Sequence, residues 1–292
     1  MPPPTWTILN LLRWTEERFQ KEGLSNPRLD AEVLLAKTLG MSRVGLYTHF
    51  DQPLQPTELA QFKKLVQRRL KREPVAYIIG EREFWSLRFK VTPDVLIPRP
   101  ETEILVHEAL KVLSQGGQKK RSWRILEMGT GSGAISIALA KELPSASLVA
   151  TDLSERALSI AEENARQNGV REQIHFLPGD LFNPLGKGWR FELIISNPPY
   201  IPQDRFPFLM PEVRDFEPRI ALDGGKDGLA FFRRALPTVG EFLQPRSWFL
   251  AEIGAGQDRA VQQIAEKNPE LNSFDFVADL AGTKRVFRAQ KK

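Results

Sequence analysis

Two short motifs, well separated along the chain, carry the side chains whose chemistry can be recognised. One is the glycine-rich run Glu127-Met128-Gly129-Thr130-Gly131-Ser132-Gly133, and the other is Asn197-Pro198-Pro199-Tyr200. Each motif follows an apolar run that is typical of a buried strand. Glycines at such a turn suit a nucleotide-like cofactor, and the Asn and Pro can hold a flat amide or amine nitrogen. In this order the two motifs predict one active site, which transfers a methyl group to a planar nitrogen.

The glycines lie where a predicted strand turns into a predicted helix. Without Cβ atoms, Gly129, Gly131 and Gly133 let the backbone turn tightly and approach a ligand, and the helix N-terminus offers free N–H donors. Asp152 ends the next predicted strand, where its carboxylate can accept hydrogen bonds from both hydroxyls of a ribose. With Ala134 the loop also satisfies the dinucleotide fingerprint. The loop alone therefore leaves both S-adenosylmethionine and NAD open.

Two further acids favour S-adenosylmethionine. Glu127 precedes the glycines, where it can bind the ammonium group of a methionine moiety and would repel a pyrophosphate. Asp180 follows the third predicted strand and can accept a hydrogen bond from the adenine amino group, while Phe182 can pack on the adenine ring. We therefore expect the cofactor to contact Glu127, Gly129, Thr130, Gly131, Ser132, Gly133, Asp152, Asp180, Leu181, Phe182 and Asn197.

The Asn-Pro-Pro-Tyr motif suits an amide nitrogen, which is a poor nucleophile because its lone pair is delocalised into the carbonyl. The side-chain carbonyl of Asn197 and the backbone carbonyl of Pro198 can accept its two N–H groups. Pro198 and Pro199 fix φ and remove competing donors, and Tyr200 can stack on the flat group. A simple turn after a strand would explain the motif alone, but not its position downstream of the glycine loop. NAD chemistry gives no reason for the motif, so S-adenosylmethionine is the predicted cofactor.

The composition is that of a soluble globular enzyme. The chain has 292 residues, of which 41% are hydrophobic and 26% charged, and no apolar stretch approaches the ~18 residues of a membrane span. We expect no signal peptide and a cytoplasmic location. There is no cysteine, and His49, His107 and His175 are scattered, so we expect no metal site. The net charge of +5 mildly favours an acidic partner, although the basic run 63–72 is usually explained by a solvated helix face.

The elements that must position the two motifs change character along the chain. Residues 5–72 predict helices, and the stripe of Leu59, Phe62, Val66 and Leu70 puts the basic side chains on the opposite side. Alternating residues after Pro74 predict a hairpin. From Trp123 onward strands alternate with helices, which predicts βαβ units and a mostly parallel sheet, and 116–122 reads as a flexible loop. The expected domains are a helical domain over 1–74, a hairpin connector over 75–98 and a methyltransferase domain over 99–292.

Several longer segments resemble a known family over nearly the whole chain. They are Arg72-Glu73-Pro74-Val75-Ala76-Tyr77-Ile78-Ile79-Gly80, Ile97-Pro98-Arg99-Pro100-Glu101-Thr102-Glu103 and Phe216-Glu217-Pro218-Arg219-Ile220-Ala221-Leu222-Asp223-Gly224-Gly225. With the two motifs, they resemble the release factor glutamine methyltransferases, the PrmC/HemK family. The resemblance implies a class I S-adenosylmethionine-dependent methyltransferase fold, which is Rossmann-like, with a small N-terminal helical bundle. It also implies methylation of the Gln side chain in the Gly-Gly-Gln motif of class 1 peptide chain release factors.

The resemblance also implies roles for single residues. Asn197 and Pro198 would hold the Gln amide with Pro199 beside them, Tyr200 would line the pocket, and Arg99 and Glu101 would close over the site. The helical domain would bind the release factor. Apart from the resemblance, we expect a monomer that requires no direct contact with nucleic acid. Two departures from the family are Glu127, where Asp is usual, and Leu181 before Phe182, which leaves open the side chain that flanks the adenine.

Two other readings remain open. A nucleic-acid adenine amino-methyltransferase shares the Asn-Pro-Pro-Tyr motif and suits the basic charge, but residues 5–72 are too small to read a base sequence convincingly. A non-catalytic module that binds the translation machinery would not require Asn197, Asp152 and the glycine loop together. A methyltransferase that acts on release factors is therefore the preferred interpretation.

Overall fold

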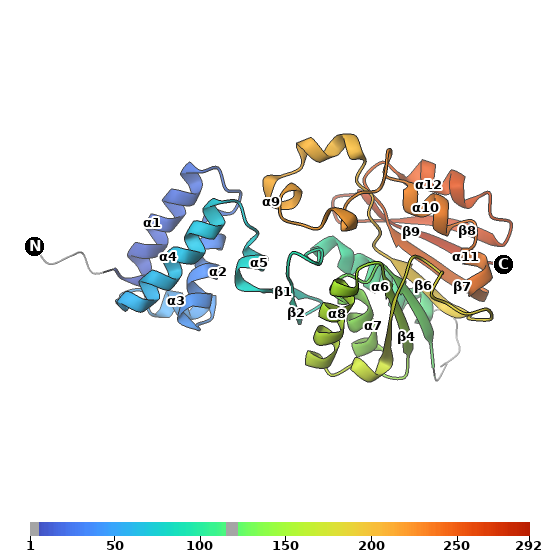
Figure 1. Ribbon diagram of the computed structural model, residues 1–292, viewed down its shortest axis with the longest axis horizontal. Coiled ribbons are helices and arrows are strands. Elements are labelled where there is room, and N and C mark those ends of the chain that lie inside the picture. Colours follow the sequence, from blue (N-terminus) through green and yellow to red (C-terminus); the bar gives the residue numbers. More distant parts are fainter. Residues whose placement is uncertain (1–5, 115–121) are drawn as a thin grey trace, which may run out of the picture. The chain divides into compact units, whose positions relative to one another are not determined.

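The computed structural model describes residues 6–114 and 122–292 and divides into two compact units (Figure 1). The first, here called the helical unit, comprises Met1–Gly80 together with Met210–Phe216, as far as these are described. The second, the sheet unit, comprises Glu81–Leu209 and Glu217–Lys292. The predicted loop 116–122, except for Ser122, lies outside the described residues, as do residues 1–5. The sheet unit thus begins at Glu81, inside the segment that the sequence analysis treats as a connector.

Amphipathic helices build the helical unit: α1 (Ile8–Lys21), α2 (Pro27–Leu39), α3 (Arg43–Thr48), α4 (Pro56–Leu70) and α5 (Val75–Ile79). The hydroxyl of Thr7 caps α1 by accepting a hydrogen bond from the backbone N–H of Asn10. Gly40 ends α2 in the left-handed region at φ 63°. Phe19 and Phe62 are buried in the shared core, so one face of each helix is covered by its neighbours.

One basic residue of α4 is not on the solvated face that the sequence predicts. Arg69 is 4% exposed, and its guanidinium donates to Asp30 at 2.7 Å and to Glu212 at 3.1 Å. Glu212 lies on the short helix α9 (Pro211–Arg214), in the distant segment that belongs to the helical unit. The expectation of a solvated face is therefore wrong for Arg69, because a buried cation between two carboxylates is an internal ion-pair network.

The sheet unit opens with the antiparallel hairpin of β1 (Glu81–Phe84) and β2 (Leu87–Lys90). Its turn is made by Trp85 and Ser86, which both have positive φ, as a tight hairpin turn requires. The buried side chain of Asn164 accepts a hydrogen bond from the Lys90 N–H at 2.7 Å and donates to the carbonyls of Lys90 and Ser132. The hairpin is thereby fastened to the glycine loop.

Seven strands form the central sheet of this unit, in the order β5-β4-β3-β6-β7-β9-β8. Their bounds are β3 (Arg124–Met128), β4 (Ser147–Asp152), β5 (Ile174–Pro178), β6 (Phe191–Ser196), β7 (Leu243–Glu252), β8 (Leu271–Ala278) and β9 (Lys284–Lys291). Strands β3 to β7 pair in parallel, whereas β9 pairs antiparallel with β7 and β8. The predicted mostly parallel sheet is therefore confirmed. Strand order reverses between β3 and β6, and ligands of open α/β sheets bind at such a switch point.

Helices cover both faces of the sheet, as Figure 1 shows. The main helices are α6 (Glu103–Ser114), α7 (Ala134–Glu142), α8 (Glu155–Gln167), α10 (Ala230–Ala235), α11 (Val239–Phe242) and α12 (Asp258–Ala265). Neighbouring residues of β3 point to opposite cores: Ile125 packs with α6 and α7, and Leu126 packs with α10 and α11. Short 3₁₀ turns complete the unit at Pro100–Thr102 (η1), Arg171–Gln173 (η2), Gln203–Phe208 (η3) and Arg219–Ala221 (η4). Among the helices described, none is long and apolar enough to span a membrane.

Candidate active site

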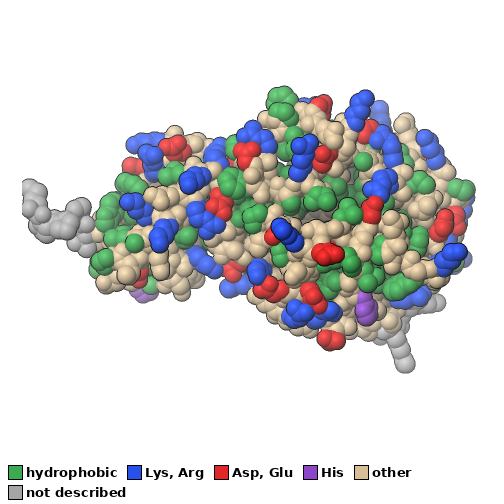
Figure 2. Space-filling model, in the orientation of Figure 1, with side chains coloured by type: hydrophobic (Ala, Val, Ile, Leu, Met, Phe, Trp, Pro, Cys, Tyr) green, Lys and Arg blue, Asp and Glu red, His purple; other side chains and the backbone are tan. Residues whose placement is uncertain are grey.

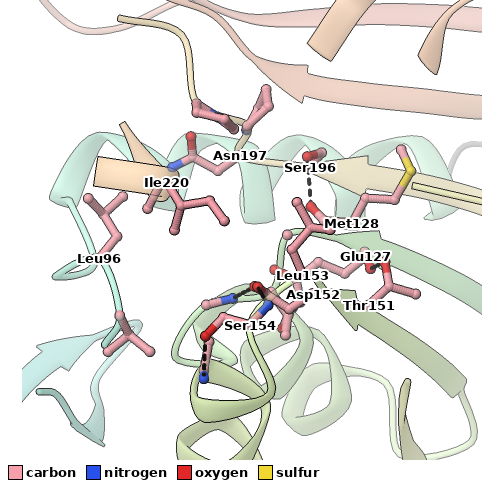
Figure 3. A pocket seen from close by; sticks show the side chains of 18 of the residues that line it. Leu96, Glu127, Met128, Thr151, Asp152, Leu153, Ser154, Ser196, Asn197 and Ile220 are labelled. Atoms are coloured by element: carbon pink, nitrogen blue, oxygen red, sulfur yellow. Dashed lines mark hydrogen bonds between the residues drawn. The ribbon is translucent and has the colours of Figure 1, made fainter. Parts of the chain in front are cut away.

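A cavity of about 290 Å³ lies at the carboxyl ends of β3, β4 and β6, where the sheet order reverses. Of the residues expected to act, those that line it are Glu127, Gly129, Thr130, Gly131, Ser132, Asp152, Asp180, Leu181, Asn197, Pro198 and Pro199. Figure 3 shows Asn197 and Ile220 on one side of the cavity and Asp152, Leu153 and Ser154 across from them. The two sequence motifs therefore face one space, as a single active site requires.

The carboxylate of Asp152 holds the glycine loop in place. Its Oδ2 accepts the Gly131 N–H at 2.8 Å, and its Oδ1 accepts the Ser154 N–H at 2.9 Å. Burial raises the pKa of Asp152 even though these backbone hydrogen bonds favour the ionised form. A carboxylate can accept more hydrogen bonds than these, and Asp152 lines the cavity, so the side chain can accept from a ligand while it fixes the loop.

Gly133 is not among the residues that line the cavity, and its expected contact with the cofactor stays a prediction. It begins α7 with φ at 82°, a conformation that side chains other than glycine rarely adopt. A Cβ atom there would lie 2.9 Å from Cδ1 of Ile137 and 3.3 Å from the backbone of Ala161. Glycine is therefore needed at this position for close packing of α7 against α8.

Glu127 is a nearly fully buried acid beside the glycine loop. Its Oε2 accepts hydrogen bonds from the Thr130 hydroxyl at 2.7 Å, from the Ser136 N–H at 3.0 Å and from the Ser136 hydroxyl. Burial raises the pKa of Glu127 to about 7, and the nearby charge of Asp152 adds to that rise. Across residues 6–114 and 122–292, no hydrogen bond reaches Oε1 of Glu127. This oxygen can accept a hydrogen bond from a ligand cation, and such a cation would keep the Glu127 carboxylate ionised.

Asp180, Leu181 and Phe182, which follow β5, have different surroundings in the structure. Asp180 forms an ion pair with Arg234 of α10, and both side chains line the cavity. Leu181 also lines it. Phe182 does not, because its buried ring stacks on Phe242 with a centroid distance of 4.4 Å. In this structure Leu181 and not Phe182 lies at the cavity, and the contact of either side chain with an adenine stays a prediction.

The end of β6 is held by neighbours on both sides. The Ser196 hydroxyl donates to the carbonyl of Met128 at 2.7 Å, a bond visible in Figure 3, which ties β6 to β3. The next residue, Asn197, donates from Nδ2 to the hydroxyl oxygen of Thr102 at 3.0 Å. That hydroxyl in turn donates to Oε2 of Glu252 at 2.7 Å. Sequence reasoning assigned no role to Thr102 or Glu252, although Thr102 lies inside the segment 97–103 that it singled out.

Tyr200 is not among the residues that line the cavity, and its expected contact with a substrate stays a prediction. Its hydroxyl is 3.4 Å from Oε1 of Glu252, and its backbone carbonyl accepts from Nε2 of Gln257 at 3.0 Å. Burial and the charge of Glu252 raise the pKa of Tyr200 to about 12, so the phenol stays neutral at physiological pH. In this structure the neutral Tyr200 hydroxyl therefore donates to Glu252.

Arg99 and Glu101 also lie outside the cavity wall. The guanidinium of Arg99 pairs with the buried carboxylate of Glu217, which also accepts the Ile97 N–H at 3.4 Å. Glu101 is exposed. The expectation that these two side chains close over the site stays a prediction; in this structure Arg99 joins segment 97–103 to Glu217. Its neighbours Pro98 and Thr102 line the cavity instead.

No cluster of three or more His, Cys, Asp and Glu side chains that could bind a metal ion is found among the residues described. The cavity is lined by hydrogen-bond acceptors, among them the carboxylates of Glu127, Asp152 and Asp180, and by the amide of Asn197 next to Pro198 and Pro199. Such an arrangement can bind a cationic nucleoside-like ligand and orient N–H groups beside it.

Two family models match this chain. The PrmC N-terminal domain matches residues 10–80, and the methyltransferase small domain matches residues 102–207. A release factor glutamine methyltransferase of Geobacter sulfurreducens is 48% identical over 259 residues, which cover 89% of this chain and 88% of that protein. The relatives of the same description from Rhodopirellula baltica and Vibrio cholerae are each 40% identical and cover 98% of this chain and 97% of their own lengths.

Solved structures are similar in fold at low sequence identity. The N-terminal domain of human METTL16 in complex with SAH has a TM-score of 0.51 and 17% identity, and the match covers 70% of this chain and 76% of that one. A methyltransferase from Pyrococcus furiosus has a TM-score of 0.50 and 17% identity, with 80% and 98% covered. These likenesses support the class I methyltransferase fold of the sheet unit.

Proposed function

This chain belongs to the release factor glutamine methyltransferases, and from that premise we propose that it methylates the glutamine side chain in the Gly-Gly-Gln motif of class 1 peptide chain release factors. The methyl donor is S-adenosylmethionine. The observation that carries the proposal is the position of Asn197, across one cavity from Glu127 and Asp152. An acceptor for a substrate N–H thus faces the acids that suit the cofactor.

The residues at the cavity fit S-adenosylmethionine. The free Oε1 of Glu127 is an acceptor for its ammonium group, and Asp152 is an acceptor for its ribose hydroxyls. Leu181 offers an apolar surface to the adenine, and Asp180, oriented by Arg234, an acceptor for the adenine amino group. When bound, the cofactor supplies an electrophilic methyl group on a sulfonium.

The chain's own contribution is to orient the amide nitrogen. Asn197 Oδ1 and the Pro198 carbonyl each accept one N–H, which stops the amide from rotating and keeps its lone pair directed into the cavity. Pro198 and Pro199 fix φ, so that little conformational entropy is lost when the substrate binds. Holding two reacting atoms in contact geometry lowers the barrier by up to roughly 7–11 kcal/mol.

The helical unit is the proposed contact surface for the release factor. Its residues 10–80 match the PrmC N-terminal domain, and this supports a role in recognising the protein substrate, separate from the chemistry of the sheet unit. We further propose that the enzyme works as a monomer, in the cytoplasm, and that it needs no direct contact with nucleic acid.

A nucleic-acid adenine amino-methyltransferase is the second candidate, because Asn-Pro-Pro-Tyr can equally hold the amino group of a base. On the face shown in Figure 2, the described Lys and Arg side chains are scattered among acidic and apolar ones and form no continuous basic patch. A surface that follows a phosphate backbone is typically a basic groove or stripe. The match of residues 10–80 to the PrmC N-terminal domain favours the protein substrate.

Incubation with radiolabelled S-adenosylmethionine tests the proposal. Three acceptors are compared: an unmethylated release factor, its Gly-Gly-Gln→Gly-Gly-Ala variant, and DNA. We expect label on the wild-type factor and none on the variant. Label on DNA alone would overturn the proposal and favour the second candidate.

A further inference from the structure

A chain of hydrogen bonds leads from the cavity into the interior of the sheet unit. Nδ2 of Asn197 donates to Oγ1 of Thr102 at 3.0 Å, and Oγ1 of Thr102 donates to Oε2 of Glu252 at 2.7 Å. Thr102 is 4% exposed and Glu252 is 3% exposed. These buried bonds are shielded from competing water, so the bonded groups alone determine which one donates and which one accepts.

The direction of the chain follows from the chemistry of its inner end. An ionised carboxylate only accepts hydrogen bonds, so Glu252 requires the single hydroxyl proton of Thr102. The Thr102 oxygen is then left as an acceptor, and Asn197 must present its NH₂ group to it. Consequently Oδ1 of Asn197 faces away from Thr102, and no hydrogen bond to it is made by the parts of the chain that the structure describes.

The fold brings the three residues together from three separate segments. Ser196 of β6 is paired in register with Ala251 of β7, so Asn197 and Glu252 occupy the next position on adjacent parallel strands. Thr102 ends the turn η1 and reaches the same edge of the sheet. The Tyr200 hydroxyl also lies 3.4 Å from Oε1 of Glu252. Burial raises the pKa of Glu252, and the hydrogen bond from Thr102 and the positive charge of Arg285 oppose that rise.

We propose that Thr102 and Glu252 are positioning residues that hold the Asn197 side chain in one of its two amide orientations, with the carbonyl oxygen toward the cavity. Without them the two ends of the amide would differ little in energy, and the flipped form would present a donor where the substrate N–H needs an acceptor. The identity of that substrate rests on the proposed function. The orientation of Asn197 in the free enzyme does not.

Thr102→Val is the decisive variant, because valine has nearly the shape of threonine and no hydroxyl. Thr102→Ser is its matched control, since it keeps the hydroxyl and loses a methyl group. Thr102→Ala serves as a second hydroxyl-free variant if the valine protein does not fold. Thermal melting and binding of S-adenosylhomocysteine check that each full-length protein is folded.

The first readout needs no substrate. In protein labelled with ¹⁵N-asparagine, the Asn197 NH₂ signals are assigned by their loss in Asn197→Ala, and their exchange with solvent is measured. We expect exchange about 10-fold faster in Thr102→Val than in the wild type and in Thr102→Ser, because one hydrogen bond has been removed. Equal exchange in the wild type and Thr102→Val would overturn the proposal, whatever the enzyme methylates.

The second readout is turnover on the release factor. We expect Thr102→Val to lower kcat by roughly 10- to 100-fold with little change in cofactor affinity, and Thr102→Ser to stay near the wild type. Combined with Asn197→Ala, Thr102→Val should add no further loss, because it acts through Asn197. A full additional loss in the double variant would overturn the proposal. If the wild type itself leaves the release factor unlabelled, the proposed function fails, while the exchange measurement still decides the role of Thr102.

Discussion

Arg99 and Glu217 form an ion pair that joins two segments lying far apart in the sequence. One is segment 97–103, and the other begins at Glu217. Both segments then continue into the cavity wall, through Pro98 and Thr102 on one side and Pro218 and Ile220 on the other. The pair therefore fixes the wall opposite the glycine loop without contacting the reacting groups.

Arg99→Gln should destabilise the protein, because it leaves the buried carboxyl of Glu217 without its cation. Arg99 is partly exposed and Glu217 can take up a proton, so the loss in the free energy of unfolding should be about 1–3 kcal/mol. Urea unfolding measures it. Arg88→Gln, at an exposed position of the same unit, is the control, and equal effects of the two substitutions would contradict this role for the pair.

Asn197→Ala should lower kcat by roughly 10²–10³, as expected for the loss of one oriented polar group, and should leave cofactor affinity nearly intact. Steady-state kinetics on the release factor and calorimetry with S-adenosylhomocysteine separate the two effects. Near-normal turnover in this variant would refute the assigned role of Asn197.

Asp152→Ala should weaken binding of S-adenosylmethionine by about 10-fold or more, because it removes an acceptor for the ribose and also frees the Gly131 N–H that the carboxylate holds. Asp152→Asn keeps an acceptor oxygen and should lose less. Calorimetry on both variants tests the ranking, and unchanged affinity in Asp152→Ala would remove this residue from the cofactor site.

Leu181→Ala should mainly affect the affinity for the cofactor, and Phe182→Ala should mainly affect the stability of the protein. Leu181 lines the cavity, so its truncation should weaken cofactor binding with little effect on stability. Phe182 is buried and stacks on Phe242, so its truncation should lower the free energy of unfolding by about 3–5 kcal/mol. Urea unfolding and cofactor titration of both variants check this, and the reverse pattern would mean that Phe182 contacts the adenine.

Turnover should fall as the pH is lowered through about 7. Burial, with a contribution from the charge of Glu101, raises the pKa of Glu252 to about 7, although Arg285 and the hydrogen bonds from Thr102 and Tyr200 favour its ionised form. Above this pH the carboxylate accepts from Thr102 and Asn197 is held. Below it the carboxyl carries its own proton and can donate to Thr102, so the amide loses its fixed orientation.

The pH dependence of kcat at saturating cofactor isolates Glu252 from Glu127, whose pKa burial also raises to about 7. A bound ammonium group keeps Glu127 ionised, so the protonation of Glu127 affects the cofactor affinity and not kcat. The variant Glu252→Gln has no titrating group at this position and should lack the inflection. If the inflection persists in that variant, it belongs to another group.

Much of this protein follows from local patterns in the sequence. The alternation of strands and helices after Trp123 gives the mostly parallel sheet, because apolar periodicity is a property of each segment. The glycine loop and the Asn-Pro-Pro-Tyr motif identify the two sides of the cavity, since turn chemistry depends on neighbouring residues alone.

The tertiary structure decided which of the neighbouring side chains face the cavity. Gly133, Phe182 and Tyr200 belong to the predicted site but are not among the residues that line the cavity. Gly133 packs between two helices, the ring of Phe182 stacks on Phe242, and the hydroxyl of Tyr200 contacts Glu252. The apolar pattern of its own helix predicts a solvated Arg69. That pattern cannot show the ion pair with Glu212, because Glu212 is far away in the sequence.

Thr102 and Glu252 show the reverse case. Thr102 lies in the segment 97–103, but nothing in its spacing reveals a contact with Asn197 or with Glu252. The three side chains are linked only because β6 and β7 are neighbours in the sheet and η1 ends beside them. The order of strands in a sheet is set by the packing of the whole core, and periodicity within one strand carries no information about which strand lies next to it. The sequence by itself thus determined the kinds of groups at the site, and the sheet order determined which groups hold them.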